Sequence, residues 1–298
     1  MSERLQSDPA TIRAAMGKRN GIVHDMPEAD YHAHSALSST GARRLLESPA
    51  KFQYERTHPR AGRAAFDLGT AVHTKVLGTG AGAIAYPDEH LTPSGNVSTK
   101  AATVEWAEEQ RGLGLTPLAP AQMREVDAMA EAVLAHSIAR KLAEQPGMQE
   151  ASVFATDAHT GVQARCRYDF LPDLDGPQPI AWDLKTTAKS ASAEEFTKTV
   201  LNLGYDVQDT FYDRVLQSAV GAEIPFVFVV VEVDAPHLVN VHQLDIVFRE
   251  MGKTKVQRAL ETFAQCTESG VWPGFPEEVN LLSPPVWAVY QHEERYPS

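Results

Sequence analysis

The run PFVFVVVEV, residues 225–233, constrains the fold of this chain more than any other feature. It is almost continuously apolar and rich in β-branched valine. A strand with one face in water alternates apolar and polar residues, whereas a continuous apolar run of this length is typical of a strand covered on both faces. The sequence therefore predicts a sheet with helices packed against each side, which is a mixed α/β (α+β) architecture.

Four further stretches predict strands around this one. QEASVFATD and VQARCRYDFLP alternate on either side of the turn AHTG, which predicts a hairpin. PIAWDLKTT predicts the next strand, and HLVNVHQL predicts an edge strand after the apolar run. We therefore expect a central mixed sheet of about five strands.

Stretches with helical periodicity precede the hairpin and connect the later strands. In LSSTGARRLLESPAKF a helix begins that Ser38 or Ser39 can cap and that Pro49 interrupts. Residues Thr79–Thr99 are rich in Gly, Pro and Ser and predict a loop. Further helices are predicted at residues 64–78, 100–111, 120–144, 193–221 (one or two helices) and 245–270.

The amino-acid composition argues against several classes of protein. Apolar residues make up 43% of the 298 residues and charged residues 22%, which is ordinary for a globular protein. No apolar run approaches the roughly 20 residues that span a bilayer, and the N-terminal stretch lacks the apolar core of a signal peptide. Cys166 and Cys266 form no CxxC pair, which argues against a disulfide framework, a zinc ribbon or an iron–sulfur cluster. We expect a cytoplasmic protein with no membrane partner.

The net charge of −12 counts against a protein that coats nucleic acid nonspecifically. It leaves room for an enzyme that holds DNA in one local basic channel. Positive charge does concentrate in the N-terminal part of the chain, at Arg43, Arg44, Lys51, Arg56, Arg60 and Arg63.

Asp183 and Lys185 interrupt the predicted strand PIAWDLKTT. Residues i and i+2 of a strand project from the same face, so the carboxylate and the ammonium lie side by side. A bare Asp-x-Lys is most often a surface ion pair. Asp169, however, ends the preceding strand, and if the two strands are neighbours, both carboxylates can converge on a cation such as Mg²⁺ or Mn²⁺. Lys185 then stands beside the reacting phosphate.

Three more residues accompany this group. His73 follows Gly69 by four residues on a predicted helix, and Gly69 suggests that the backbone of this helix approaches the sheet closely. Gln208 and Tyr212 are also four residues apart and share one helix face. Taken alone, each is better explained by packing or by a surface position.

In chain order these features are G-x-x-x-H, a Glu at a strand start, R-x-D, D-x-K-T-T and Y-x-V-Q-D-x-F-Y. The series resembles the PD-(D/E)XK nuclease superfamily, and more narrowly the RecE branch (exodeoxyribonuclease VIII) and its phage relatives. RYDFLP, DLKTT and YDVQDTFYDRVLQ are the nearest matches, and the resemblance covers roughly residues 28 to 265. Tyr168-Asp169 stands where the name-giving motif has Pro-Asp.

The resemblance implies a PD-(D/E)XK core with a helical N-terminal region. We expect a flexible lead-in over residues 1–27, a single exonuclease domain over 28–270 and a C-terminal tail over 271–298. By position, the resemblance implies metal ligands at His73, Asp169, Asp183 and the backbone carbonyl of Leu184, with Lys185 as the catalytic lysine. It further implies that Glu150 orients a metal-bound water or a second metal, with Asp157 as a nearby alternative acid. Gln208 and Tyr212 would support the site.

The activity implied is Mg²⁺-dependent digestion of linear double-stranded DNA from its ends, 5′→3′, with Mn²⁺ as a substitute metal. The product is a 3′ single-stranded tail for phage-type recombination through a single-strand annealing protein, and a homo-oligomeric ring would enclose the DNA. Ser39, Arg43 and Arg44, with Ser38 and Thr40, suit a 5′-terminal phosphate at a helix start; a simple capped helix is the alternative. An endonuclease on the same core and a non-catalytic DNA-binding module are the competing functions.

Overall fold

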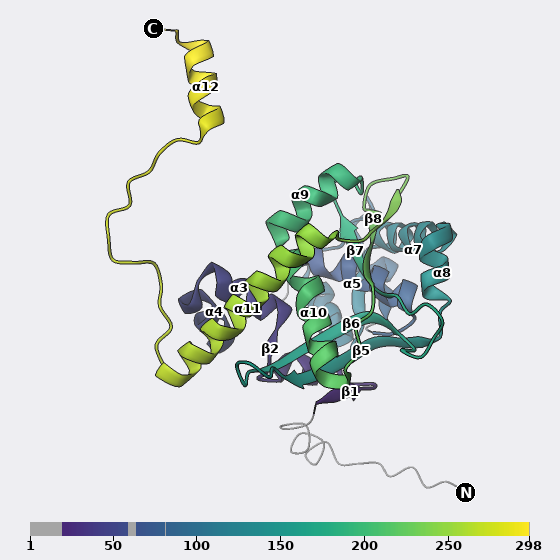
Figure 1. Cartoon of the computed structure of the whole chain (residues 1–298). Helices are drawn as coiled ribbons and strands as arrows, with labels where there is room; N and C mark the ends of the chain where they lie inside the picture. The colour runs from purple at the N-terminus through teal and green to yellow at the C-terminus, as the bar shows by residue number, and fades with distance from the viewer. Residues whose placement is uncertain (1–19, 59–63, 81, 298) are drawn as a thin grey trace, which may run out of the picture.

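The structure is a computed structural model that describes residues 20–58, 64–80 and 82–297. Its centre is a seven-stranded sheet in the order β1-β5-β6-β7-β8-β9, with β2 added against β6 (Figure 1). The strands are β1 (Gly21–Val23), β2 (Leu37–Ser38), β5 (Gly147–Thr156), β6 (Gln163–Pro172), β7 (Ala181–Thr187), β8 (Phe226–Glu232) and β9 (Val239–His242). The mixed fold predicted from the sequence is confirmed.

All five predicted strands are present, as β5 to β9. β5 and β6 form the predicted antiparallel hairpin, β7 runs parallel to β8, and β9 pairs antiparallel with β8. The prediction of about five strands was low because β1 and β2 have only three and two residues, too few to show an alternation. β1 pairs with β5 although it falls within the predicted lead-in 1–27, whose residues 1–19 lie outside the described part of the chain.

Helices cover both faces of the sheet, as the run 225–233 predicts. Phe226, Phe228 and Val230 of β8 pack on one side, and Val227 and Val229 pack on the other. The first face carries α3 (Ser39–Glu47), α9 (Ala193–Leu203), α10 (Tyr205–Val220) and α11 (Ile246–Ser269), and the second carries α5 (Ala64–Leu77), α7 (Pro120–Ala135) and α8 (Ser137–Ala143).

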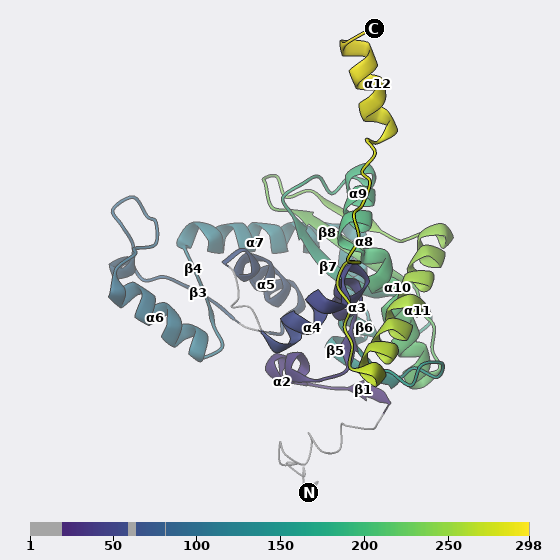
Figure 2. The same cartoon turned by 90° about the vertical axis from the view of Figure 1, so that its left-hand side faces the viewer.

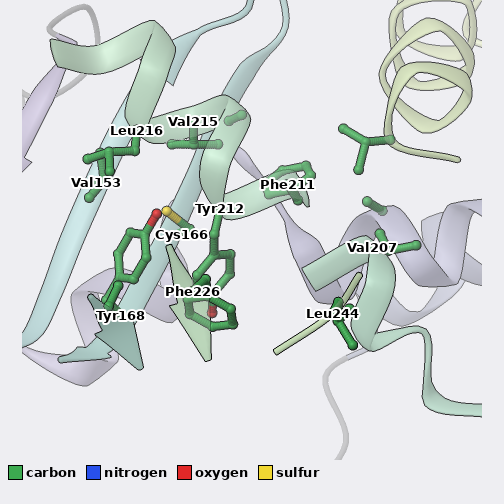
Figure 3. Close-up of a cluster of buried hydrophobic side chains, with 14 of the residues drawn as sticks. Val153, Cys166, Tyr168, Val207, Phe211, Tyr212, Val215, Leu216, Phe226 and Leu244 are labelled. Carbon is green, nitrogen blue, oxygen red and sulfur yellow. The ribbon is translucent and has the colours of Figure 1, made fainter. Parts of the chain in front are cut away.

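The α10 side of the core is rich in aromatic side chains (Figure 3). Tyr212 of α10 points toward the strands, where it meets Tyr168 of β6 and Phe226 of β8. The rings of Tyr168 and Tyr212 lie 4.9 Å apart, edge to face. This packing fixes one face of α10 against β6, β7 and β8, and that face also carries the side chains that reach the site.

The N-terminal part is helical, as predicted, with one small addition. It contains α2 (Glu28–Ala33), α4 (Pro49–Thr57) and α6 (Ala101–Gly112), together with a two-stranded sheet of β3 (Ala83–Ala85) and β4 (Thr116–Leu118). Figure 2 shows α6, β3 and β4 extending beyond α5 and α7, away from the main sheet. The predicted helix 120–144 divides at His136, whose Nδ1 accepts from the Ala139 N–H and caps α8.

The C-terminal tail first packs against the rest of the protein and then extends away from it. Trp272 packs against Phe52 and Phe263, and the Pro273 carbonyl accepts from the Ala50 N–H. A later stretch forms α12 (Val286–Arg295), a helix that the sequence analysis did not predict and that stands apart from the body in Figures 1 and 2. Among the described residues, no helix combines the length and the apolar character needed to cross a membrane.

Gly252 allows α11 to cross α10 closely, and this contact generates a stability prediction. A Cβ at this position would meet the Asp206 carbonyl oxygen and would lie 2.6 Å from Thr210 Oγ1. Gly252→Ala is therefore expected to lower the free energy of unfolding by about 1–3 kcal/mol. Urea denaturation followed by circular dichroism measures this change.

Gly112→Ala is the matched control, because a Cβ there meets no described atom within 4 Å and the residue is also helical. It is expected to leave stability unchanged or to raise it by up to about 1 kcal/mol. Equal stability of the two variants would contradict the close helix crossing.

Candidate active site

The site forms where β6 and β7 separate. Phe170 and Trp182 are the pair that joins these strands, and one step further in the same register Asp169 comes opposite Asp183. Beyond this point the Leu184 N–H donates to Asp169 Oδ2 at 2.7 Å. A buried N–H needs an acceptor, so the side chain of Asp169 replaces a backbone carbonyl at the fork. The two strands are neighbours, which was the condition for a shared site.

Glu150 extends this row of acids to a third strand. The pairs Gln149–Phe170 and Ala151–Tyr168 flank it and place it opposite Asp169. Its φ of 50° is unusual for a residue with a side chain. Backbone strain of this kind costs about 1–3 kcal/mol and persists where the surroundings impose it. Burial, and then the charge of Asp169, raises the pKa of Glu150 to about 7.

His73 reaches Asp169 from α5, on the other side of the cleft. Its Nδ1 lies 2.8 Å from the Gly69 carbonyl, and its Nε2 lies 3.0 Å from Asp169 Oδ2. The carbonyl can only accept, so Nδ1 carries a proton and Nε2 is the nitrogen that faces the carboxylate. Gly69 brings α5 close to β7, since a Cβ there would lie 3.4 Å from Thr186 Oγ1.

The charge of Asp169 controls the protonation of His73. Burial lowers the pKa of His73, but the neighbouring carboxylate more than offsets burial and raises this pKa to about 9. Burial also raises the pKa of Asp169, but His73 and then Lys185 hold it below its ordinary value. The pair is therefore an imidazolium–carboxylate pair at neutral pH.

Asp183 and Lys185 form a second charged pair, and it is not a surface pair. Asp183 is only 3% exposed, and the Lys185 ammonium lies against its Oδ2. Gln208 donates to Asp183 Oδ1 at 2.6 Å, and the Tyr205 ring lies 5.0 Å from the Lys185 Nζ. Burial and the charge of Asp169 raise the pKa of Asp183, and Lys185 opposes this. Burial lowers the pKa of Lys185, but Asp183 reverses the shift, so the ammonium keeps its charge.

A cleft with a volume of about 890 Å³ opens over these pairs. The residues predicted for the site that line it are Ser39, His73, Glu150, Asp169, Leu184, Lys185 and Tyr212. Asp183 and Gln208 lie beneath it and hold Lys185 in place. The structure thus brings together every residue expected at the catalytic and metal positions.

Three residues that the sequence suggested for the site lie outside the cleft lining: Arg43, Arg44 and Asp157. Arg44 pairs with Glu47 and Glu55 on the outer side of α3, outside the cleft lining. Arg43 donates to the Leu203 carbonyl at 2.6 Å and to Thr40, so its guanidinium already binds the protein itself.

The third of these residues is Asp157, the alternative to Glu150. Arg214 Nε donates to Asp157 Oδ2 at 2.6 Å, and the Thr160 N–H and hydroxyl donate to Oδ1. Asp157 therefore stabilises the hairpin turn, away from the cleft. At the start of α3, Ser38 Oγ accepts from the Gly41 N–H, which is the capped-helix alternative given for this segment.

No role was predicted for two arginines of the cleft, although Arg167 is the Arg of the R-x-D motif. Arg165 and Arg167 stand four and two residues before Asp169 on β6 and enclose the Tyr31 ring at 4.8 and 4.4 Å. They also donate to backbone carbonyls of the segment before α3, including Met26 and His32. The signal that could have found them is the alternation R-C-R-Y-D, which places both arginines on the strand face of Asp169.

The oxygen and nitrogen atoms of the site that could bind a metal suit a hard divalent cation. In the structure their side chains form two ion pairs, His73–Asp169 and Asp183–Lys185. Within the described residues, no three His, Cys, Asp or Glu side chains are grouped tightly enough to hold a metal ion. Asp183 Oδ2 is buried, with the Lys185 ammonium against it but no hydrogen bond of regular geometry from any described residue. Carboxylate oxygens and one imidazole with its other nitrogen fixed are ligands that fit Mg²⁺ or Mn²⁺.

A mixed sheet flanked by helices, with an acid on one strand and Asp-x-Lys on the next, defines a PD-(D/E)XK-like protein. Residues 38–284 match the family described as "PDDEXK-like domain of unknown function (DUF3799)". This match spans most of the chain, and the chain belongs to that family. The resemblance to the PD-(D/E)XK superfamily is thereby confirmed.

Comparison with solved structures supports the same fold. A structure described as "Putative exonuclease" from Eubacterium rectale aligns with a TM-score of 0.55, covers 90% of this chain and 98% of that chain, and is 11% identical. At that identity the likeness concerns the fold alone. The structure of SSO0001 is 15% identical over 67% of this chain and 85% of that one, but its TM-score of 0.29 carries no argument. No curated protein matches the sequence.

The His73–Asp169 pair yields a prediction that needs neither metal nor DNA. Asp169→Asn removes the charge that offsets burial, so the pKa of His73 is expected to fall from about 9 to below its ordinary value of 6.5. Proton NMR titration of the His73 Cε1–H, assigned with a His73→Gln variant, measures this pKa.

Asp157→Asn is the control, because that carboxylate binds Arg214 at the hairpin turn. It is expected to leave the pKa of His73 near 9. A His73 pKa that is equally high in Asp169→Asn would show that the carboxylate does not control the imidazole.

Proposed function

We propose that this protein is a Mg²⁺-dependent exonuclease that digests linear double-stranded DNA 5′→3′ and leaves 3′ single-stranded tails. One observation carries the proposal: Lys185, held by Asp183, stands over the same cleft as the His73–Asp169 pair in a PDDEXK-like fold. A cation site and a fixed ammonium side by side are the groups that phosphodiester hydrolysis uses.

The proposed metal ligands are Asp169, Asp183, the Leu184 carbonyl and His73 Nε2, which would release its proton when a cation binds. Gly69 accepts from His73 Nδ1 and so aims Nε2 into the cleft, and the Leu184 N–H orients Asp169. A bound cation would lower the pKa of a water and stabilise negative charge on the phosphate. Glu150 lines the cleft opposite Asp169 and is the proposed acceptor for a proton from that water.

Lys185 is the proposed catalytic lysine. Asp183 and the Tyr205 ring fix its ammonium, and Gln208 fixes Asp183 in turn. A charged donor that is already in place stabilises developing charge without reorganising during the reaction. Tyr212 closes this side of the cleft, with its ring packed on Tyr168 and Phe226.

The charged side chains that line the cleft support the proposal that DNA binding requires a metal ion. Four carboxylates line the cleft, those of Asp25, Glu28, Glu150 and Asp169, alongside the cationic side chains of His73, Arg165, Arg167 and Lys185. A phosphate that approaches Glu150 and Asp169 meets like charge unless a cation neutralises them. Ser39, which lines the cleft at the start of α3, is the proposed contact for a DNA phosphate.

Exonuclease action is favoured over endonuclease action by the sequence resemblance and by the Eubacterium rectale structure, which is itself described as a "Putative exonuclease". The same resemblance supports a ring-shaped homo-oligomer, a single-strand annealing partner and a cytoplasmic location in a bacterial or phage-infected cell. A non-catalytic DNA-binding module is disfavoured, because a decayed site would be expected to lose at least one of His73, Asp169, Asp183 and Lys185.

Digestion of end-labelled linear duplexes with Mg²⁺ or with chelator tests the proposal. Mg²⁺-dependent release of the 5′ label as mononucleotide is expected, while a 3′ label stays on the shrinking duplex. Lys185→Ala and Asp183→Ala are each expected to lower kcat by about 10²–10³-fold or more.

A covalently closed circle of the same sequence separates the competing functions. The circle is expected to remain intact, whereas cleavage of the circle would indicate an endonuclease. Arg44→Ala is the matched surface control and is expected to retain full activity because Arg44 pairs with Glu47 and Glu55 outside the cleft. Lack of Mg²⁺-dependent duplex loss, or equal rates in wild type and Lys185→Ala, would overturn the proposal.

A further inference from the structure

A second cavity of about 250 Å³ shares Lys185 with the main cleft. It lies between the end of β7, the turn after it and one face of α9. Lys185, Thr186 and Tyr205 line both cavities. The catalytic lysine therefore stands at the junction of a large cleft and a small cavity.

The small cavity is lined by two lysines, Lys185 and Lys189, and by groups that can donate and accept hydrogen bonds. Thr187, Thr199 and Asn202 contribute hydroxyl and amide groups, and Phe196 and Leu203 contribute apolar surface. Each of the two lysines is already paired with a carboxylate, Lys185 with Asp183 and Lys189 with Glu195 at 3.2 Å. A second phosphate would find little free positive charge here, whereas a sugar and base would find both apolar walls and hydrogen-bonding groups.

The wall of this cavity is held in place by contacts at the base of the turn. The Ala191 carbonyl accepts from His242 Nε2 at 2.9 Å and from Asn240 at 3.2 Å. Glu232 Oε1 accepts from the Ala191 N–H at 2.7 Å. These contacts tie the turn after β7 to β8 and β9, so the cavity is a preformed feature.

We propose that this cavity binds the terminal nucleoside of the strand being cut, with the scissile phosphate on the 3′ side of that nucleoside at Lys185 and its sugar and base against Thr199 and Asn202. The inference rests on the proposed nuclease function and adds a subsite for the released nucleotide. A volume of about 250 Å³ corresponds to roughly eight waters at the ~30 Å³ that each occupies in the liquid. That is room for one nucleoside and too little for a base pair.

Thr199→Phe, which fills the cavity, is the test variant, and Thr197→Phe is its matched control. Both threonines are on α9, and both hydroxyls donate to the carbonyl four residues earlier, at 3.1 and 2.7 Å. Thr197 is exposed and lies outside the cavity lining. The two variants therefore differ in the cavity and little else.

Calorimetric titration of thymidine 3′-monophosphate into the metal-free protein measures the subsite directly. Wild type and Thr197→Phe are expected to bind with equal affinity, and Thr199→Phe about tenfold or more weakly. On linear duplex with Mg²⁺, Thr199→Phe is expected to lose turnover by a similar factor while Thr197→Phe matches wild type.

The outcomes separate this inference from the proposed function. Duplex digestion by wild type, with Thr199→Phe equal to Thr197→Phe in both assays, overturns the subsite and leaves the nuclease intact. Nucleotide binding that Thr199→Phe abolishes, in a wild type that digests no duplex, supports the subsite and overturns the nuclease. If Thr199→Phe melts well below Thr197→Phe, Asn202→Ala decides: weaker nucleotide binding by about threefold or more supports the subsite, and unchanged binding overturns it.

Discussion

The hydrogen bond from the Leu184 N–H to Asp169 Oδ2 is the interaction on which the site depends. A sheet that ran on regularly past Trp182 would bond β6 to β7 through their backbones and leave no room between them. Because the part of β6 before Phe170 does not pair with β7, the Leu184 N–H needs another acceptor, and the Asp169 carboxylate supplies it. The same carboxylate binds His73 from α5, so one side chain joins two strands and a helix at the fork.

The second constraint is the balance of buried charge. Two carboxylates, Asp169 and Asp183, lie next to each other in register, and each has a cationic partner, His73 and Lys185 respectively. Removing one member of such a pair leaves an uncompensated charge, which is costly in a buried site. Glu150 lies in the same row with a looser partner, Arg167 at 3.8 Å, and burial beside Asp169 raises its pKa to about 7. A divalent cation suits this acid-rich row.

Much of the fold could be predicted from the periodicity of apolar residues along the chain. The rest depends on strand pairing, which this periodicity does not encode. The run 225–233 required cover on both faces, and the alternation around AHTG located β5 and β6. The short strands β1 and β2 gave no such signal, because their place is set by pairing with β5 and β6.

At the site, spacing located Asp183, Lys185 and the Gln208–Tyr212 face, since these positions follow from strand and helix geometry alone. Residue spacing alone does not decide whether Glu150 or Asp157 is the third acid of the site. That choice depended on the register of the hairpin and on Arg214, which comes from a distant helix. A bare Asp-x-Lys gives no sign of the burial of Asp183, because that burial depends on the packing of α10, whose Gln208 donates to the Asp183 carboxylate.

The central claim is that the fork between β6 and β7 binds a divalent cation, and calorimetric titration of Mn²⁺ tests it most directly. Wild type and Asp157→Asn are expected to bind Mn²⁺ alike, whereas Asp169→Asn and Asp183→Asn are expected to lose most of that binding. Equal Mn²⁺ affinity in wild type, Asp169→Asn and Asp183→Asn, or absence of binding in wild type, would contradict the account.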